Sequence, residues 1–319
     1  MEKLLEVKDL KVSFFTDLGE TQAVKGAGFA IGEGDFFGIV GESGSGKSVT
    51  TKSILRLGPS NCKIMGGEIL FRGEDILKKN EAELREIRGG EIAMIFQDSL
   101  SALNPVYTVG NKMVELIRRH TNMNKKEAKA RVLELLTAVG ITDPEKAMNS
   151  YPHELSGGMR QRVMIAMAMS SDPKILIADE PTTALDVTIQ AQILHLLLEL
   201  QKKNNMSIIL ITHDLGVVAQ TCKRVAVMCG GYVVEEGTVE EIFLHPGHPY
   251  TQALIASMPR VGGTFEQFLE RDFSDGNGNL CPFLNRCKYA DKTCEACLPK
   301  YYEASEGHRI FCHRREEKR

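Results

Sequence analysis

A glycine-rich segment that ends in lysine and serine has the composition of a phosphate-binding loop. It runs Gly41-Glu42-Ser43-Gly44-Ser45-Gly46-Lys47-Ser48 and is followed by Val49, which fits the pattern G-x-x-x-x-G-K-[ST]. Glycines let successive backbone N–H groups wrap a phosphate, and the N-terminus of a following helix adds partial positive charge. We expect Lys47 to reach the β- and γ-phosphates of a nucleotide and the Ser48 hydroxyl to bind Mg²⁺.

Two acidic residues follow an apolar run over residues 175–178. Carboxylates at the end of a buried strand are unfavourable unless they meet a cation. We therefore predict that Asp179 holds the magnesium shell and that Glu180 orients and polarises an attacking water.

A third segment, Ser156-Gly157-Gly158-Met159-Arg160-Gln161, combines a helix-capping serine with glycines that leave amide groups open to an anion. In company with the first two segments it resembles the signature sequence of ABC ATPases. Four further positions are similar to marks of that family. They are Gln97 as the Q-loop glutamine, Asp186 of the D-loop, His213 as the switch histidine, and Phe14 as the aromatic that stacks on adenine, although Phe15 is adjacent.

The resemblance implies the chemistry of a head-to-tail dimer. ATP and Mg²⁺ are the expected cofactors, with Ser48, Gln97 and Asp179 around the metal. Glu180, His213, Gln97 and Lys47 are the expected catalytic residues. Ser156, Gly157, Gly158 and Gln161 are expected to contact the ATP that a partner subunit holds.

Three segments resemble the ATPases of oligopeptide and dipeptide importers, in particular their D-type subunit: Phe96–Pro105, Leu155–Ala168 and His245–Thr251. This implies a paralogous F-type ATPase subunit (or a self-dimer), two transmembrane permease subunits, an extracytoplasmic peptide-binding protein, and a peripheral location on the cytoplasmic face of the membrane. A nickel or antimicrobial-peptide importer is the alternative. A soluble ABC ATPase acting on DNA or ribosomes is the distant one, since the chain shows neither a long coiled-coil insertion nor a second ATPase unit.

Five of the eight cysteines lie in the last forty or so residues: Cys281, Cys287, Cys294, Cys297 and Cys312. Thiolates at such density favour a soft metal. In the family resemblance the site carries a [4Fe–4S] cluster, for which Cys281, Cys287, Cys294 and Cys312 match best. Cys297 competes with Cys294 for the third position. Zinc is the alternative because Cys294-x2-Cys297 is typical zinc spacing. The third interpretation is that these cysteines are reduced thiols that bind no metal.

The elements that must position these residues follow from hydrophobic patterning. Residues 4–7 and 10–15 alternate as short, half-exposed antiparallel strands, whereas residues 36–40, 175–178 and 207–212 are continuous apolar runs typical of buried parallel strands. A helix is expected from Lys47 to Leu57. Residues 98–169 look mostly helical, with a capping box at Asn124 and Glu127 and a stop at Gly140.

These elements predict an α/β fold. The resemblance implies that it is an ABC ATPase with a RecA-like parallel sheet, an N-terminal antiparallel β subdomain, a helical insertion and a Cys-rich C-terminal lobe. The expected divisions are 1–97 with 171–240, 98–170, and 241–319. Of 319 residues, 43% are hydrophobic and 25% charged, with a net charge of −3. This composition excludes a disordered chain and gives no basic footprint for nucleic acid, and no apolar run approaches the roughly 18 residues of a membrane helix.

Overall fold

The computed structural model describes residues 3–97, 103–183, 185–258 and 280–314. The chain divides into two compact units. The first unit comprises residues 1–31, 37–77 and 212–319, and the second comprises residues 32–36 and 78–211. Within the described ranges, no helix has the length and apolar character required to cross a bilayer.

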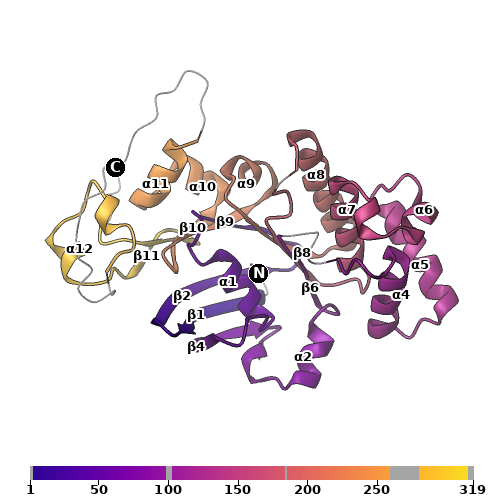
Figure 1. Cartoon of the computed structure of the whole chain (residues 1–319). Helices are drawn as coiled ribbons and strands as arrows, with labels where there is room; N and C mark the ends of the chain where they lie inside the picture. Colours follow the sequence, from indigo (N-terminus) through magenta and orange to yellow (C-terminus); the bar gives the residue numbers. More distant parts are fainter. Residues whose placement is uncertain (1–2, 98–102, 184, 259–279, 315–319) are drawn as a thin grey trace. The chain divides into compact units, whose positions relative to one another are not determined.

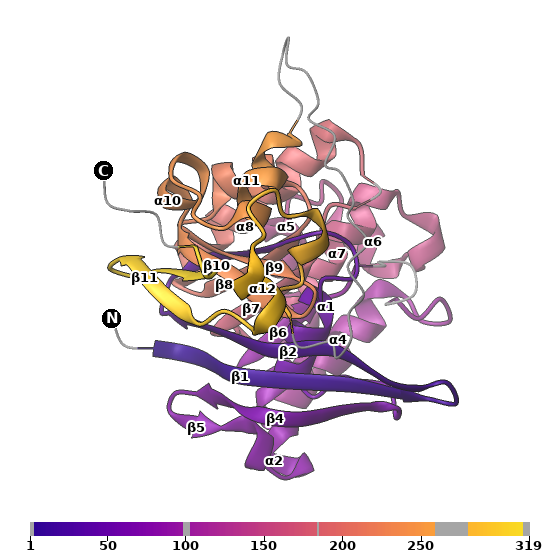
Figure 2. The same ribbon diagram turned by 90° about the vertical axis from the view of Figure 1, so that its left-hand side faces the viewer.

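The first unit contains a sheet with the strand order β2-β1-β4-β5 (Figure 2). Strand β4 is antiparallel to both β1 and β5. The bounds are β1 (Lys3–Thr16), β2 (Gly19–Gly32), β4 (Cys62–Phe71) and β5 (Glu74–Asp75).

The alternating pattern at the N-terminus was predicted as two strands, and this was wrong in one respect: both belong to the single strand β1. The register against β4 shifts on either side of Lys11, and Asp9 has a positive φ of 44°. A bulge inserts a residue without ending a strand. It interrupts the alternation in the sequence while the pairing with β4 continues on both sides.

Five further strands of the first unit are paired side by side in the order β11-β12-β10-β9-β3; β11, β10 and β9 are labelled in Figure 1. Strand β3 is parallel to β9, and the remaining pairs are antiparallel. The strands are β3 (Phe36–Val40), β9 (Arg224–Cys229), β10 (Tyr232–Thr238), β11 (Tyr301–Ser305) and β12 (His308–Phe311). The helices of this unit are α1 (Lys47–Ile54), α9 (Leu215–Thr221), α10 (Val239–Leu244), α11 (Pro249–Ala256), η3 (Leu284–Arg286) and α12 (Lys292–Ala296). The short helix η1 (Ile76–Lys78) includes the boundary between residues 77 and 78, where the chain passes from the first unit to the second.

The second unit is built on three strands in the order β8-β7-β6. The central strand β7 pairs in parallel with both β6 and β8. The strands are β6 (Ile92–Ile95), β7 (Ile175–Asp179) and β8 (Ser207–Thr212). Strands β7 and β8 are buried along their whole length, as the continuous apolar runs predicted. The helices are α2 (Glu81–Ile87), α4 (Val109–His120), α5 (Lys125–Ala138), α6 (Pro144–Asn149), η2 (Pro152–Glu154), α7 (Gly157–Ala168) and α8 (Val187–Asn204).

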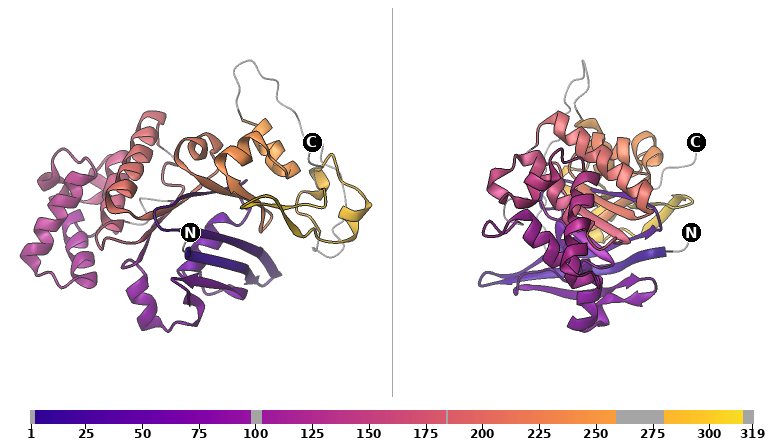
Figure 3. Two further views of the ribbon diagram at one scale, coloured as in Figure 1. Left: turned by 180° about the vertical axis from the view of Figure 1, so that it is seen from behind. Right: turned by 90° about the vertical axis from the view of Figure 1, so that its right-hand side faces the viewer.

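Helices α4 to α7 form one group within this unit (Figure 3, magenta to pink). The predicted capping box is present. The Asn124 side chain accepts from the backbone of Glu127, and the Glu127 side chain accepts from the backbone of Asn124. The chain leaves α5 through Gly140, whose φ of 76° suits glycine. Local sequence signals thus fix this helix at both ends.

Candidate active site

The phosphate loop connects the buried strand β3 to helix α1, as predicted. Two of its glycines are required by their surroundings. At Gly41, with φ at 152°, a Cβ atom would overlap the carbonyl oxygen of Met228. At Gly46, with φ at 99°, a Cβ atom would lie 2.7 Å from the carbonyl oxygen of Ala23. Gly46 also caps α1 without any side-chain hydrogen bond to the first turn. Backbone N–H groups at this helix start suit an anion.

Lys47 and Ser45 point their polar groups into this loop. The Lys47 ammonium donates to the carbonyl oxygens of Gly41 at 2.7 Å and Glu42 at 2.8 Å, and its side chain is only 5% exposed. The buried Ser45 hydroxyl has no hydrogen-bond partner among the described residues. A held cation and an unsatisfied hydroxyl inside a loop of backbone amides are suited to phosphate oxygens.

In the second unit the structure brings together Gln97 and Glu180. Glu180 follows β7 directly after the fully buried Asp179, and it has a left-handed φ of 47°. Its Oε2 atom accepts from the Gln97 amide at 2.8 Å and from the Thr183 hydroxyl at 2.9 Å. Such a backbone conformation is unfavourable for a residue with a Cβ atom and is common at functional sites. The arrangement holds a carboxylate in one orientation, as a residue that positions water requires.

The signature residues and the D-loop are also neighbours in the second unit. Ser156 caps α7, and its hydroxyl accepts from the backbone of Met159 at 3.3 Å. A Cβ atom at Gly158 would lie 3.0 Å from the Ile189 side chain, close to where Asp186 caps α8. Gln161 is buried in α7. Residues 98–102, which belong to the predicted segment Phe96–Pro105, and Ala184, which precedes Asp186 by two positions, lie outside the described residues.

The remaining predicted residues lie in the first unit. His213 is exposed between β8 and α9. Phe14 is half-buried and paired with Cys62 across β1 and β4, whereas the neighbouring Phe15 is 36% exposed with the Lys63 ammonium 5.2 Å from its ring centre. The phosphate loop, His213 and Phe14 thus belong to one unit, while Gln97, Asp179, Glu180, Ser156 and Asp186 belong to the other.

Comparison with known sequences decides the family. The pattern described as ABC transporter matches residues 24–183, and that described as the C-terminal region of oligopeptide/dipeptide transporters matches residues 234–294. The chain belongs to the ABC transporter family. The resemblance read from the sequence is thereby confirmed, including its oligopeptide/dipeptide branch.

Curated relatives and solved structures agree with this assignment. The chain is 50% identical to the dipeptide transport ATP-binding protein DppD of Bacillus subtilis over 98% of its own length and 95% of that protein. It is 45% identical to the protein of the same name from Escherichia coli, over 97% and 96%. A dimeric bacterial ABC transporter cassette aligns with a TM-score of 0.66 and 30% identity, covering 74% of this chain and 98% of that one.

The C-terminal region of this ABC ATPase is organised around a buried carboxylate that the sequence analysis missed. Glu235 on β10 is fully buried and accepts from the backbone N–H groups of Gly247 at 2.7 Å and His248 at 2.9 Å. It also lies 2.7 Å from the His308 ring nitrogen. These bonds hold the segment His245–Thr251 that the sequence analysis singled out. His248 caps α11, and the Tyr250 hydroxyl accepts from the backbone N–H of Glu42 in the phosphate loop at 2.9 Å.

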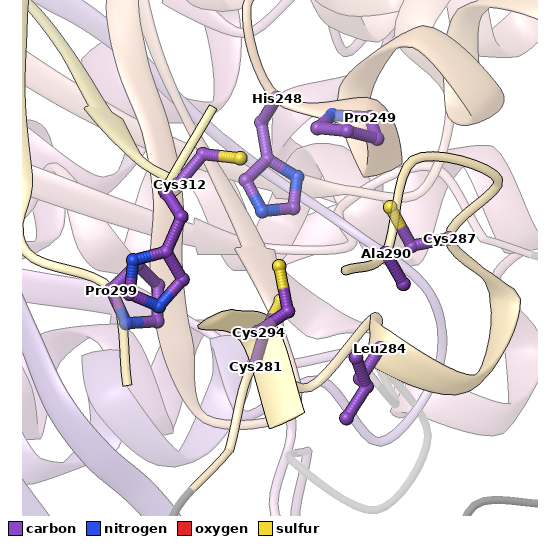
Figure 4. A pocket seen from close by; sticks show the side chains of 10 residues that line it. His248, Pro249, Cys281, Leu284, Cys287, Ala290, Cys294, Pro299 and Cys312 are labelled. Carbon is purple, nitrogen blue, oxygen red and sulfur yellow. The ribbon is translucent and has the colours of Figure 1, made fainter. Parts of the chain in front are cut away.

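Four cysteines line one small cavity in this region together with His248 (Figure 4). They are Cys281, Cys287, Cys294 and Cys312, the set that the sequence analysis matched best, and Cys297 is exposed outside it. No three His, Cys, Asp or Glu side chains in the described segments are grouped so as to hold a metal ion. Burial raises the pKa of the Cys281 thiol to about 12 and also raises the pKa of Cys294 and Cys312.

Proposed function

We propose that this chain is the ATP-hydrolysing subunit that drives a membrane importer of dipeptides or oligopeptides. The observation that carries the proposal is the double match: an ABC ATPase pattern is joined to the C-terminal region of oligopeptide/dipeptide transporters. Relatives at 45–56% identity carry the names dipeptide or oligopeptide transport ATP-binding protein. As part of this proposal, the chain is divided into an ATPase core (residues 1–97 and 171–240), a helical signature part (98–170) and a C-terminal extension (241–319).

In the proposed mechanism, the phosphate loop binds the ATP phosphates through backbone N–H groups and the Lys47 ammonium. Glu180, held by Gln97 and Thr183, orients the attacking water and accepts its proton. His213 is proposed to contact the γ-phosphate and Phe14 the adenine. Ser48, Gln97 and Asp179 offer the hydroxyl, amide and carboxylate oxygens that Mg²⁺ prefers, and the ion would neutralise phosphate charge.

The signature residues are proposed to act in trans. Ser156, Gly157, Gly158 and Gln161 would complete the site on a partner's ATP, with Asp186 near the same interface. Solved ABC cassettes of this fold include dimers, one of them in a post-hydrolysis state with ADP and Pi. The proposed partners are a paralogous F-type ATPase subunit, two transmembrane permease subunits and, indirectly, an extracytoplasmic peptide-binding protein. The chain would then act at the cytoplasmic face of the membrane.

Substitution of Glu180 by Gln tests the hydrolytic role. The amide keeps the size of the side chain but cannot accept a proton, so we expect turnover to fall at least about 100-fold. ATP binding, followed with a fluorescent analogue, should persist. Wild-type hydrolysis rates in this variant would contradict the assignment, and peptide uptake by vesicles that contain the complete transporter tests the substrate class.

We further propose that Cys281, Cys287, Cys294 and Cys312 hold a [4Fe–4S] cluster. The residues fit such a group in two respects. Four thiols surround one cavity, and the Nε2 atom of the buried His248, which lines the same cavity, has no hydrogen-bond partner among the described residues. A zinc ion on four thiolates is the alternative occupant of this cavity, and the metal analysis below distinguishes the two. When bound, the cluster would cross-link the lobe and could exchange an electron.

Iron and acid-labile sulfide analysis of anaerobically purified protein tests this site. About four iron and four sulfide per chain are expected, with a broad visible absorbance. Substitution of any of the four cavity cysteines by Ser should abolish the absorbance. The matched control is Cys297→Ser, which alters an exposed thiol of the same lobe and should retain it. Bound zinc, or colourless protein without metal, would contradict the cluster.

A further inference from the structure

The segment between Cys281 and Cys287, which both line the cavity, also contacts the phosphate loop. Arg286 lies just before Cys287, and its guanidinium donates through both terminal nitrogens to the two carboxylate oxygens of Glu42, each at 2.9 Å. Both residues belong to the first unit, although 244 positions separate them in the chain. A bidentate arginine–carboxylate pair fixes geometry as well as charge.

Aromatic side chains hold this arginine in place. Its guanidinium lies 5.1 Å from the ring centre of Phe283 and 5.9 Å from that of Tyr250, and the two rings meet edge to face at 5.4 Å. The Tyr250 hydroxyl accepts from the backbone N–H of Glu42 at 2.9 Å. Glu42 is thus held by its backbone and by its side chain from the same C-terminal lobe.

Pro282 makes a third connection between the cysteine segment and the loop. A Cβ atom at Gly230 would lie 2.5 Å from the Pro282 side chain, so the two segments are closely packed. The next residue, Gly231, donates its N–H to the carbonyl oxygen of Ser45 at 3.1 Å. The turn on which Pro282 rests is therefore itself bonded to the phosphate loop.

The charge of Glu42 gives this contact a consequence for ATP. A carboxylate within a loop that binds a polyphosphate repels its ligand, and this repulsion is strongest where water is partly excluded. Arg286 cancels that charge at both oxygens. Loss of the arginine would leave the Glu42 carboxylate uncompensated beside the phosphates. It would also leave the Glu42 side chain without the partner that holds it in place.

We propose that Arg286 and Tyr250 are positioning residues for ATP, and that the segment from Cys281 to Cys287 links the state of the four-cysteine cavity to nucleotide affinity. Arg286 neutralises Glu42, and Tyr250 fixes the backbone of the loop. The first part stands on the contacts alone. The link to the cavity rests on the cluster proposed above.

Nucleotide affinity of the full-length chain, measured with a fluorescent ATP analogue, tests the positioning role. We expect Arg286→Met to raise the Kd about two- to fivefold, as loss of a partly exposed ion pair beside the ligand predicts. Adding Glu42→Gln in the same chain should return the Kd to near the wild-type value, because the uncompensated charge is then gone. A purely structural arginine would not be rescued in this way.

Two further variants sharpen this test. Tyr250→Phe keeps the ring and removes only the hydroxyl, so it should weaken ATP binding while the thermal unfolding midpoint changes little. Arg314→Met is the matched control, because Arg314 stacks on Tyr289 at 3.9 Å in the same lobe without touching the loop. An unchanged Kd in Arg286→Met, or an equal rise in Arg314→Met, would overturn the positioning role.

The link to the cavity is tested by combining Cys287→Ser with Arg286→Met. If the cavity acts through Arg286, loss of iron in Cys287→Ser raises the Kd for ATP, but causes no further rise when Arg286 is already Met. If the two substitutions instead raise the Kd independently, so that their fold-changes multiply in the double variant, the link is overturned. Wild-type protein that contains no iron would overturn it together with the cluster, whereas the positioning role would still be decided by the rescue experiment.

Discussion

At the residue scale, the Glu180 carboxylate depends on two donors that reach the same oxygen atom. Gln97→Ala removes the side-chain amide that donates to Glu180, and Thr183→Val removes the hydroxyl donor that lies three residues after Glu180. A hydrogen bond to a charged group contributes about 1.5–3 kcal/mol, so we expect Gln97→Ala to lower kcat at least about tenfold. Steady-state ATPase assays of the assembled complex measure this. If Gln97→Ala alters only KM, the orienting role is wrong.

A second prediction at this scale concerns Cys222, which is buried beside Thr221. Burial raises the pKa of its thiol from 9.0 to about 12. A thiol whose folded pKa is raised stabilises the fold fully below the unfolded pKa, and this contribution is lost as the pH rises from 9 towards 12. Denaturant midpoints from pH 8 to 10.5 should therefore fall more steeply in wild type than in Cys222→Ala. Parallel curves would contradict the pKa shift.

At the scale of elements, the phosphate loop is shaped by the backbone that passes next to it. Gly41→Ala places a methyl group onto the Met228 carbonyl oxygen and should destabilise the fold by about 3 kcal/mol or prevent folding. Gly44 is the matched control. It also has a positive φ, of 78°, but no atom lies within 4 Å of its Cβ position, so Gly44→Ala should cost only about 1 kcal/mol. Thermal unfolding compares the two, and equal midpoints would contradict the role of close packing.

Structural elements that depend on neighbouring residues could be predicted from the sequence, whereas contacts between distant residues could not. The capping box of α5, the apolar runs of β7 and β8, and the loop between β3 and α1 depend on local residues, and all were predicted. The bulge in β1 was missed because Asp9 interrupts an alternation that only the pairing with β4 restores. Glu235 and Arg286 were missed because their partners lie 12 or more positions away, up to 244. An isolated Glu or Arg carries no local mark of such a contact.

At the scale of the whole molecule, each proposed ATP site is shared between two subunits, and this permits a decisive mixing experiment. Lys47→Ala removes the phosphate contact of a chain but leaves its signature intact, whereas Ser156→Arg blocks the signature but leaves the phosphate loop intact. Each variant alone should be inactive. In a mixed dimer of the two, one composite site carries both lesions and the other carries neither.

The outcome of mixing identifies the physiological dimer. If this chain pairs with itself in a closed twofold arrangement, an equal mixture forms mixed dimers and should recover about a quarter of wild-type ATPase activity. If the partner is a paralogous subunit, as we propose, mixing the two variants restores nothing, and wild-type chain alone hydrolyses ATP slowly until the paralogue is added. Recovery on mixing would therefore contradict the heterodimer while leaving the composite-site mechanism in place, because only sites built from two chains can complement in this way.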